Sequence, residues 1–312
     1  MDPITLAWYG LHLKAALLEK KEQAYEDFFC KVMIHLHSDN FQPVKAAGQA
    51  GDGKSDGYLV PEHRIFQCYA PSTGFNKSKL LKKIKEDFNG AKNNWKDKMR
   101  KWTFVHNDPE GLPKYALDLM EELKEENKDV EISVFGPDVF KEIVLSLPVS
   151  KLIDLFGPAP TQNEITTLTH DPIKTLLRAM SGRQPDSGVV IAPVSVEKLQ
   201  FNRLSSDAEF LLMAGRHKEN LVNDLLIRWP DPEYGESLAE AFREKYKTLL
   251  GMGLRPDDIF LSLKEFAGGS LEGISAQASA LAVLSYFFER CDIFENAPEG
   301  WVNDIANKAF AS

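Results

Sequence analysis

Cysteine is scarce in this chain of 312 residues. Its three cysteines, Cys30, Cys68 and Cys291, lie far apart, and no pair has the spacing of metal ligands. An odd and widely spaced set also gives no disulfide framework, which favours a reducing compartment such as the cytoplasm. We therefore expect a fold that is held by an apolar core rather than by zinc or by disulfides.

Long apolar runs are absent as well. No stretch approaches the roughly 20 apolar residues that are needed to span a bilayer. The N-terminal sequence "MDPITLAWYGLHLKAALLEKKE" has no basic start and no small-residue cleavage site, and Lys14 interrupts its apolar part. The sequence predicts neither a signal peptide nor contact with a membrane, and the expected location is cytoplasmic.

Positive charge is in deficit over the whole chain but not locally. Lys and Arg number 37 against 46 Asp and Glu, so the net charge is −9. That balance argues against a protein whose whole surface binds nucleic acid. Residues 75–101, however, contain ten basic and three acidic side chains, which predicts either a helix face that contacts DNA or an ordinary solvated surface.

The length fits two domains. In the first half, helical periodicity alternates with short apolar strands, which predicts an α/β domain around a mixed sheet flanked by helices. The expected helices cover residues 4–36 in two pieces, 76–100, 113–126 and 137–147. The expected strands cover residues 56–60, 64–70, 101–108 and 129–136.

The character of the sequence changes at "FGPAPTQ", residues 156–162, where Pro158 and Pro160 predict a linker. Beyond it we expect a mainly α-helical domain. Its helices are predicted at about residues 170–181, 206–228, 235–251 and 274–290, with a candidate lone strand at 188–195. The predicted domains are residues 1–158, with a core at about 20–150, and residues 165–312.

A glycine-rich stretch, "GQAGDGKSDGYLV" at residues 48–60, matches the phosphate-binding pattern G-x-x-x-x-G-K-[ST] from Gly48 to Ser55. A P-loop needs a buried apolar strand before it and a helix that starts at the Lys-Ser pair. Here the polar "NFQPVKAA" precedes the loop, and Gly57 and Pro61 follow too soon for a helix. A P-loop NTPase is therefore the disfavoured alternative.

The same loop supplies carboxylates next to a predicted hairpin. Asp56 opens the first strand, Gln67 lies on the second, and Tyr69 points the same way as Gln67 because side chains alternate along a strand. Glu26, on the flank of an earlier helix, offers a further carboxylate. Oxygen ligands of this kind suit Mg²⁺, which activates water and neutralises charge on a phosphate. The alternative is that Asp52 and Asp56 are ordinary turn residues with no role in binding a metal.

Three stretches, "YEDFF", "GDGKSDGY" and "FQCYAP", correspond to a helical Glu, a G-D-x-G-x-D-G loop and a Q-x-K strand. Over about residues 20–158 the chain thereby resembles the Mrr-type restriction endonucleases of the PD-(D/E)XK class. The resemblance implies a restriction-endonuclease-like fold that hydrolyses DNA. It also implies that Asp56 and Gln67 bind Mg²⁺ or Mn²⁺, that Glu26 assists, and that Asp52 shapes the loop.

One position departs from the family pattern, because Tyr69 stands where the family has Lys. A phenol with an ordinary pKa near 10 supplies no positive charge at neutral pH. Lys79 and Lys83, one turn apart on the basic helix, are the favoured replacements, and Lys54 in the loop is the other candidate. The predicted catalytic set is Glu26, Asp56, Gln67, Lys79 and Lys83.

The stretches "NRLSSDAEFLLMAG", "DPEYGESLAEAFREKYKTLLGMGLRPDDIF" and "SYFFERCDIFE" carry a second resemblance. Over about residues 165–312 the chain resembles the C-terminal module of effector proteins in bacterial ABC-three-component defence systems, of which Lamassu is an example. The resemblance implies docking on partner subunits, including an SMC-like ATPase and a further subunit.

Together the two resemblances imply a metal-dependent DNA endonuclease effector that stays inactive until its partner complex senses foreign DNA. A homo-oligomer would bring two sites onto the two strands of a duplex. The alternative is a nuclease-derived subunit that binds DNA but cuts it weakly, because the family Lys is missing.

Overall fold

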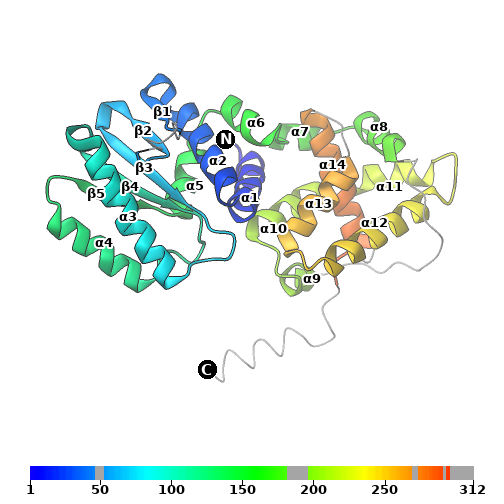
Figure 1. Ribbon diagram of the computed structural model, residues 1–312. Coiled ribbons are helices and arrows are strands. Elements are labelled where there is room, and N and C mark those ends of the chain that lie inside the picture. Colours follow the sequence, from blue (N-terminus) through cyan, green and yellow to red (C-terminus); the bar gives the residue numbers. More distant parts are fainter. Residues whose placement is uncertain (46–52, 181–195, 269–272, 291–292, 296–312) are drawn as a thin grey trace. The chain divides into compact units, whose positions relative to one another are not determined.

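The computed structural model describes residues 1–45, 53–180, 196–268, 273–290 and 293–295. Contacts divide the chain into two compact units, Leu13–Phe156 and a second unit made of Met1–His12 together with the described part of Gly157–Ser312. Helix α1 (Pro3–Glu19) supplies residues to both units (Figure 1).

The chain crosses from one unit to the other twice, and the second crossing, at Phe156–Gly157, lies inside the predicted linker. Residues 1–12 group with the second unit, although the sequence analysis placed them in the first domain. Two long-range hydrogen bonds help to place these residues with the C-terminal part. Thr5 Oγ1 donates to Pro160 O at 3.2 Å, and Tyr9 Oη donates to Gly157 O at 3.2 Å. Contacts of this range leave no local signal in a sequence.

A five-stranded mixed sheet lies at the centre of the Leu13–Phe156 unit (Figure 1). In spatial order the strands are β1 (Phe41–Pro43), β2 (Gly57–Leu59), β3 (Arg64–Tyr69), β4 (Lys101–His106) and β5 (Glu131–Phe135). β1, β2 and β3 pair antiparallel, while β3, β4 and β5 are parallel. Parallel neighbours need crossover connections, and the helices α3 (Lys77–Trp95) and α4 (Lys114–Glu126) supply them.

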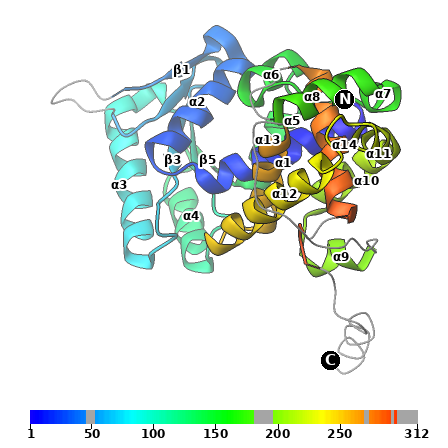
Figure 2. The ribbon, with the colours of Figure 1, turned by 90° about the vertical axis from the view of Figure 1, so that its right-hand side faces the viewer.

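Helices cover both faces of this sheet. On one face, Ile65 and Trp102 pack with apolar side chains of α3 and α4, and Figure 2 shows these two helices side by side. On the other face, Phe29 of α2 (Gln23–His37) has its ring centroid 5.4 Å from that of Phe66 and 5.7 Å from that of Phe140 on α5 (Pro137–Leu145). Adjacent strand residues such as Ile65 and Phe66 serve opposite layers because strand side chains alternate.

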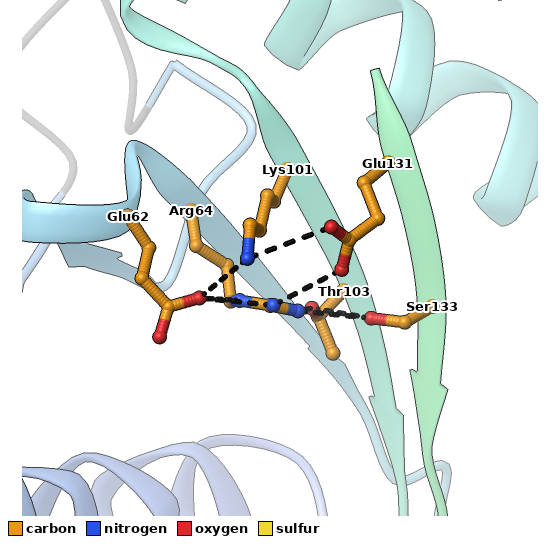
Figure 3. Close-up of polar contacts among 6 residues, drawn as sticks. All are labelled: Glu62, Arg64, Lys101, Thr103, Glu131 and Ser133. Atoms are coloured by element: carbon orange, nitrogen blue, oxygen red, sulfur yellow. Dashed lines mark hydrogen bonds and ion pairs between the residues drawn. The ribbon is translucent and has the colours of Figure 1, made fainter. Parts of the chain in front are cut away.

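A polar network joins three strands at their amino ends (Figure 3). Its members are Glu62, Arg64, Lys101, Thr103, Glu131 and Ser133. Arg64 Nη1 donates to Thr103 Oγ1 at 2.8 Å and to Ser133 Oγ at 3.1 Å, and those two hydroxyls lie 2.8 Å apart. Because Thr103 is fully buried, the network ties β3, β4 and β5 together at the edge opposite the carboxyl end of β3.

Helix α14 (Ile274–Arg290) is the central helix of the other unit. Its residues from Ala278 to Phe288 are all buried. The helices that pack against it are α7 (Gln162–Thr167), α8 (His170–Met180), α10 (Ser206–Arg216), α11 (Glu219–Ile227) and α13 (Pro256–Gly268). Helix α12 (Tyr234–Gly251) packs on α11 and α13, and the described residues of this unit also form α9 (Val196–Phe201). The remaining helix, α6 (Val149–Phe156), ends the Leu13–Phe156 unit.

The mixed sheet with its helices and the mainly helical second part confirm the predicted fold class at that level. Two predicted helices were too long. The helix expected over 76–100 ends at Trp95, since Lys96 takes a left-handed φ of 48°, and the helix expected over 206–228 is broken between α10 and α11, so that both can pack on α14. The candidate strand at 188–195 lies outside the described residues.

One strand, β1, and four α-helices of the described residues were not expected. β1 is only three residues long and falls inside a stretch interpreted as loop; its Phe41 packs over Gly57, where a Cβ would come within 2.3 Å of the ring. The four missed helices are α6, α7, α9 and α13. None of the helices in the described residues is long and apolar enough to cross a bilayer.

Candidate functional site

Asp56 is a buried carboxylate at the start of the hairpin. Its side chain reaches β3, where Oδ2 accepts hydrogen bonds from Gln67 Nε2 at 2.7 Å and from the backbone N–H of Cys68 at 2.5 Å. The antiparallel register explains this contact, because Gly57 pairs with Phe66 and therefore places the preceding residue beside Gln67. The two site residues expected on neighbouring strands are thus in direct contact.

A cleft of about 490 Å³ opens beside this pair at the carboxyl end of β3. The five predicted catalytic residues all line it: Glu26 from the first turn of α2, Asp56 and Gln67 from the hairpin, and Lys79 and Lys83 from the first two turns of α3. In α/β sheets, ligands bind preferentially at the carboxyl ends of strands. The cleft therefore lies where this architecture usually places a functional site.

Gln67 contributes a polar atom that lacks a partner. The side chain is buried, and while Nε2 donates to Asp56, Oε1 accepts no hydrogen bond from the residues that the structure describes. A buried unpaired acceptor costs about 1–3 kcal/mol, so a cation or a donor bound here would be stabilised. With the carboxylates of Asp56 and Glu26, this oxygen completes the hard donor set that Mg²⁺ and Mn²⁺ prefer, and the residues fit such an ion.

Within the described residues, no group of three His, Cys, Asp or Glu side chains is placed to hold a metal. A metal site in the cleft therefore depends on the amide oxygen of Gln67.

Two buried thiols next to Asp56 are not available as metal ligands. Burial, with the nearby carboxylates of Glu26 and Asp56, raises the pKa of Cys30 to about 12. Burial likewise raises the pKa of Cys68 well above its ordinary value, with Asp56 adding to the shift. Both thiols stay protonated at neutral pH, and because the thiolate is the form that binds metals, the candidate ligands are oxygens.

Tyr69 is neutral and brings no charge to the cleft. Burial raises its pKa further, and its ring stacks on that of Phe75 with centroids 5.8 Å apart. Positive charge comes instead from α3, where Lys79 is exposed and Lys83 is partly exposed. Lys83 Nζ lies 2.7 Å from Oδ2 of Asp87, a fully buried carboxylate that the sequence analysis did not single out. The spacing of Lys83 and Asp87, four residues on one helix, was the available signal.

The described part of the glycine-rich loop does not have P-loop geometry. Ser55 is fully buried and donates to Gly57 O at 3.1 Å, and β2 rather than a helix follows it. Lys54 Nζ lies 3.2 Å from Asp87 Oδ1. Gly48 and Asp52, and with them the predicted loop-shaping role of Asp52, lie outside the described residues.

The second unit has a cavity of a different kind. It measures about 570 Å³, and apolar side chains such as Ile4, Ile165, Phe210 and Met213 line it. None of the described residues in its lining carries a carboxylate. Phe210 and Met213 are 42% and 57% exposed, and exposed apolar side chains that gather around a cavity are a candidate surface for binding another protein.

Comparison with protein families assigns a class to the second unit. Residues 172–295 match C-terminal domain 10 of the ABC-three component (ABC-3C) systems. The matched segment runs from within α8 through α14, and it confirms the expected family for this part of the chain. The comparisons with curated proteins and with solved structures gave no match. The restriction-endonuclease-like assignment of the first unit stays a prediction.

Proposed function

We propose that this chain is the DNA endonuclease subunit of an ABC-three-component anti-phage defence system. The match of residues 172–295 to a C-terminal domain of these systems supports the membership. For the nuclease, the observation that carries the proposal is the single cleft lined by Glu26, Asp56, Gln67, Lys79 and Lys83.

The roles follow from chemistry and position. Asp56, Gln67 and Glu26 would hold Mg²⁺ or Mn²⁺, which when bound supplies an activated water and neutralises charge on the scissile phosphate. Lys79 and Lys83 place positive charge at the same cleft, where charge develops on the phosphate. The first turn of α3 contains no acidic residue, so the partial positive charge of its N-terminus adds to theirs.

DNA as substrate agrees with the surface beside the cleft. The exposed side of α3 carries Lys77, Lys79, Lys82 and Lys85. Lysines in such a row contact backbone phosphates regardless of base sequence and make binding depend on salt. The overall negative charge of the chain then confines DNA binding to this side of the first unit.

The second unit would dock on the partner subunits, an SMC-like ATPase and a further protein, and docking would activate the cleft. Its exposed Phe210 and Met213, which lie together in the lining of the apolar cavity, are the surface that we expect to make that contact. Replacing both with Glu should prevent co-purification with the partners, whereas Leu117→Glu, an equally exposed apolar residue on α4, should not. Equal retention of the partners by both variants would place the docking surface elsewhere.

Plasmid cleavage by the assembled complex with Mg²⁺ or Mn²⁺ tests the nuclease. Asp56→Asn should lower cutting at least about 100-fold, because it removes a charge that metal-assisted hydrolysis needs. Glu26→Gln, at a less buried position, should also lower it, while Asp118→Asn, on the exposed Lys114–Asp118 pair of α4, serves as the control. If Asp56→Asn and wild type cut equally, the assignment is wrong. Nucleotide binding that Lys54→Ala abolishes would instead support a P-loop.

A second function has one observation in its favour. The neutral Tyr69 at the family's lysine position suits a subunit that holds DNA without cutting it efficiently. DNA binding that falls steeply with salt, without any cleavage by the activated complex, would establish this alternative.

A further inference from the structure

Helix α3 carries one carboxylate on its buried face. Asp87 is fully buried in the same stripe as Ile84, Phe88 and Ala91. Taking a carboxylate out of water is costly unless cations compensate it, so its partners are the key to its role. Lys83 Nζ lies 2.7 Å from Asp87 Oδ2, and Lys54 Nζ lies 3.2 Å from Asp87 Oδ1.

The two lysines reach Asp87 from different parts of the first unit. Lys83 lies one turn earlier on the same helix and lines the cleft. Lys54 comes from the loop that leads to Asp56, and it is not among the described residues that line the cleft. Its stem lies over Gly90, where a Cβ would approach Lys54 Cγ to 2.5 Å. Asp87 therefore attaches the loop to α3 with one oxygen and holds a cleft lysine with the other.

Lys83 shares the cleft with the carboxyl end of β3. Gln67 and Tyr69 from the strand and Lys83 from α3 all line it. The side chain of Lys83 therefore lies in the same cleft as the strand position at which the resemblance puts a lysine.

We propose that Asp87 is a positioning residue, which holds the Lys83 ammonium in the cleft as the replacement for a lysine at position 69. This inference rests on the proposed nuclease function. A lysine side chain is flexible, and an ion pair with a buried carboxylate restrains its head group before substrate arrives. The lysine of the site then comes from the helix after the hairpin rather than from the strand.

The same helix offers a matched control. Lys82 and Glu86 have the same four-residue spacing, but their charged atoms are 3.7 Å apart and both side chains are largely exposed. A substitution of Glu86 changes the helix charge as a substitution of Asp87 does, without touching a residue of the cleft.

Cleavage kinetics of the assembled complex test the proposal. Lys83→Met should lower kcat about 100- to 1,000-fold, the usual loss when one group that stabilises a transition state is removed. Asp87→Asn should lower kcat about 10- to 100-fold with little change in KM, and the double variant should be no slower than Lys83→Met, because both act through one group. Glu86→Gln should keep the wild-type rate. Lys54→Met should reduce kcat less than Lys83→Met does; the reverse order would overturn the choice of Lys83.

A second readout needs neither partners nor DNA. Trace acylation of the full chain with acetic anhydride, followed by mass spectrometry, reports how well each lysine is held. Asp87→Asn should speed acylation of Lys83 severalfold, and Glu86→Gln should leave Lys83 unchanged. Should Asp87→Asn not fold, Lys83→Arg, which keeps the charge and the ion pair, should recover part of the kcat that folded Lys83→Met loses. Full activity of folded Lys83→Met would show that the pair is only structural.

The outcomes separate the inference from the function on which it rests. If wild type cuts, Asp56→Asn does not, and Asp87→Asn cuts like wild type, the nuclease stands and the role of Asp87 is wrong. If wild type does not cut under any activating condition, the nuclease proposal fails and the inference fails with it, whatever the acylation rates.

Discussion

Replacing Arg64 with methionine should loosen the amino edge of the parallel strands by about 2–3 kcal/mol. Methionine keeps most of the apolar stem but removes every hydrogen bond of the guanidinium. That group donates to the buried Thr103 and to Ser133, and it forms ion pairs with Glu62 and Glu131 at 3.0 and 3.3 Å (Figure 3).

The magnitude follows from burial. A hydrogen bond from a charged donor to an ordered hydroxyl contributes about 1 kcal/mol or somewhat more, and Arg64 makes two of these, to Thr103 and Ser133. The two carboxylates are 39% and 58% exposed, so each ion pair contributes only a few tenths of a kcal/mol. Thr103 and Ser133 still bond each other after the substitution, so no buried hydroxyl loses all its partners. These contributions give about 2–3 kcal/mol in total.

Amide hydrogen exchange measured by mass spectrometry locates the effect. Because 1.36 kcal/mol is a tenfold change in an equilibrium, peptides from β3, β4 and β5 should exchange about 30- to 150-fold faster in the full-length Arg64→Met protein. Lys101→Met removes only ion pairs to the same two exposed carboxylates and should change exchange less than about fivefold. Peptides from α12 should not change. Equal effects of Arg64→Met and Lys101→Met would refute the reasoning.

Three further predictions concern stability. Gly215→Ala should destabilise the α10–α14 contact by about 1–3 kcal/mol, because the new Cβ would lie 2.5 Å from Leu281 O. Gly251→Ala should not destabilise the protein, because a Cβ there meets open space, and thermal unfolding compares the two variants. Burial lowers the pKa of His106 to about 4, so its contribution to stability is complete above pH 6.5 and falls, by up to about 3 kcal/mol, as pH drops towards 4. His106→Gln should remove that slope from urea midpoints. Lys198→Met should destabilise α14, because the buried Lys198 ammonium donates to Phe288 O at 3.0 Å. Faster amide hydrogen exchange of peptides from α14 would confirm this.

Much of the first unit could be predicted because its elements carry local periodic signals. Alternation places Gln67 and Tyr69 on one face of β3, and the hairpin turn brings Asp56 alongside, so the core of the cleft was predictable. Helix α13 was missed although Pro256 and two aspartates follow the N-terminal signals of a helix. That miss was one of interpretation rather than of missing information.

Other features had no local signal. β1 is three residues long and exists through its pairing with β2, and residues 1–12 group with the second unit through contacts far along the chain. The four-residue spacing indicated that Asp87 could pair with Lys83, but only the packed structure shows that Asp87 is buried and that Lys54 reaches it too. Burial depends on what surrounds a residue, and spacing alone does not report it.

By itself, the sequence determined the class of each half, the alternation that pairs Asp56 with Gln67 and the family of residues 172–295. Each of these depends on spacing over a few residues or on similarity along the chain. Only the tertiary structure decided that Lys83 lines the cleft whereas Lys54 anchors the loop to Asp87. That choice depends on where two flexible side chains meet one buried carboxylate, and such a meeting is created by packing.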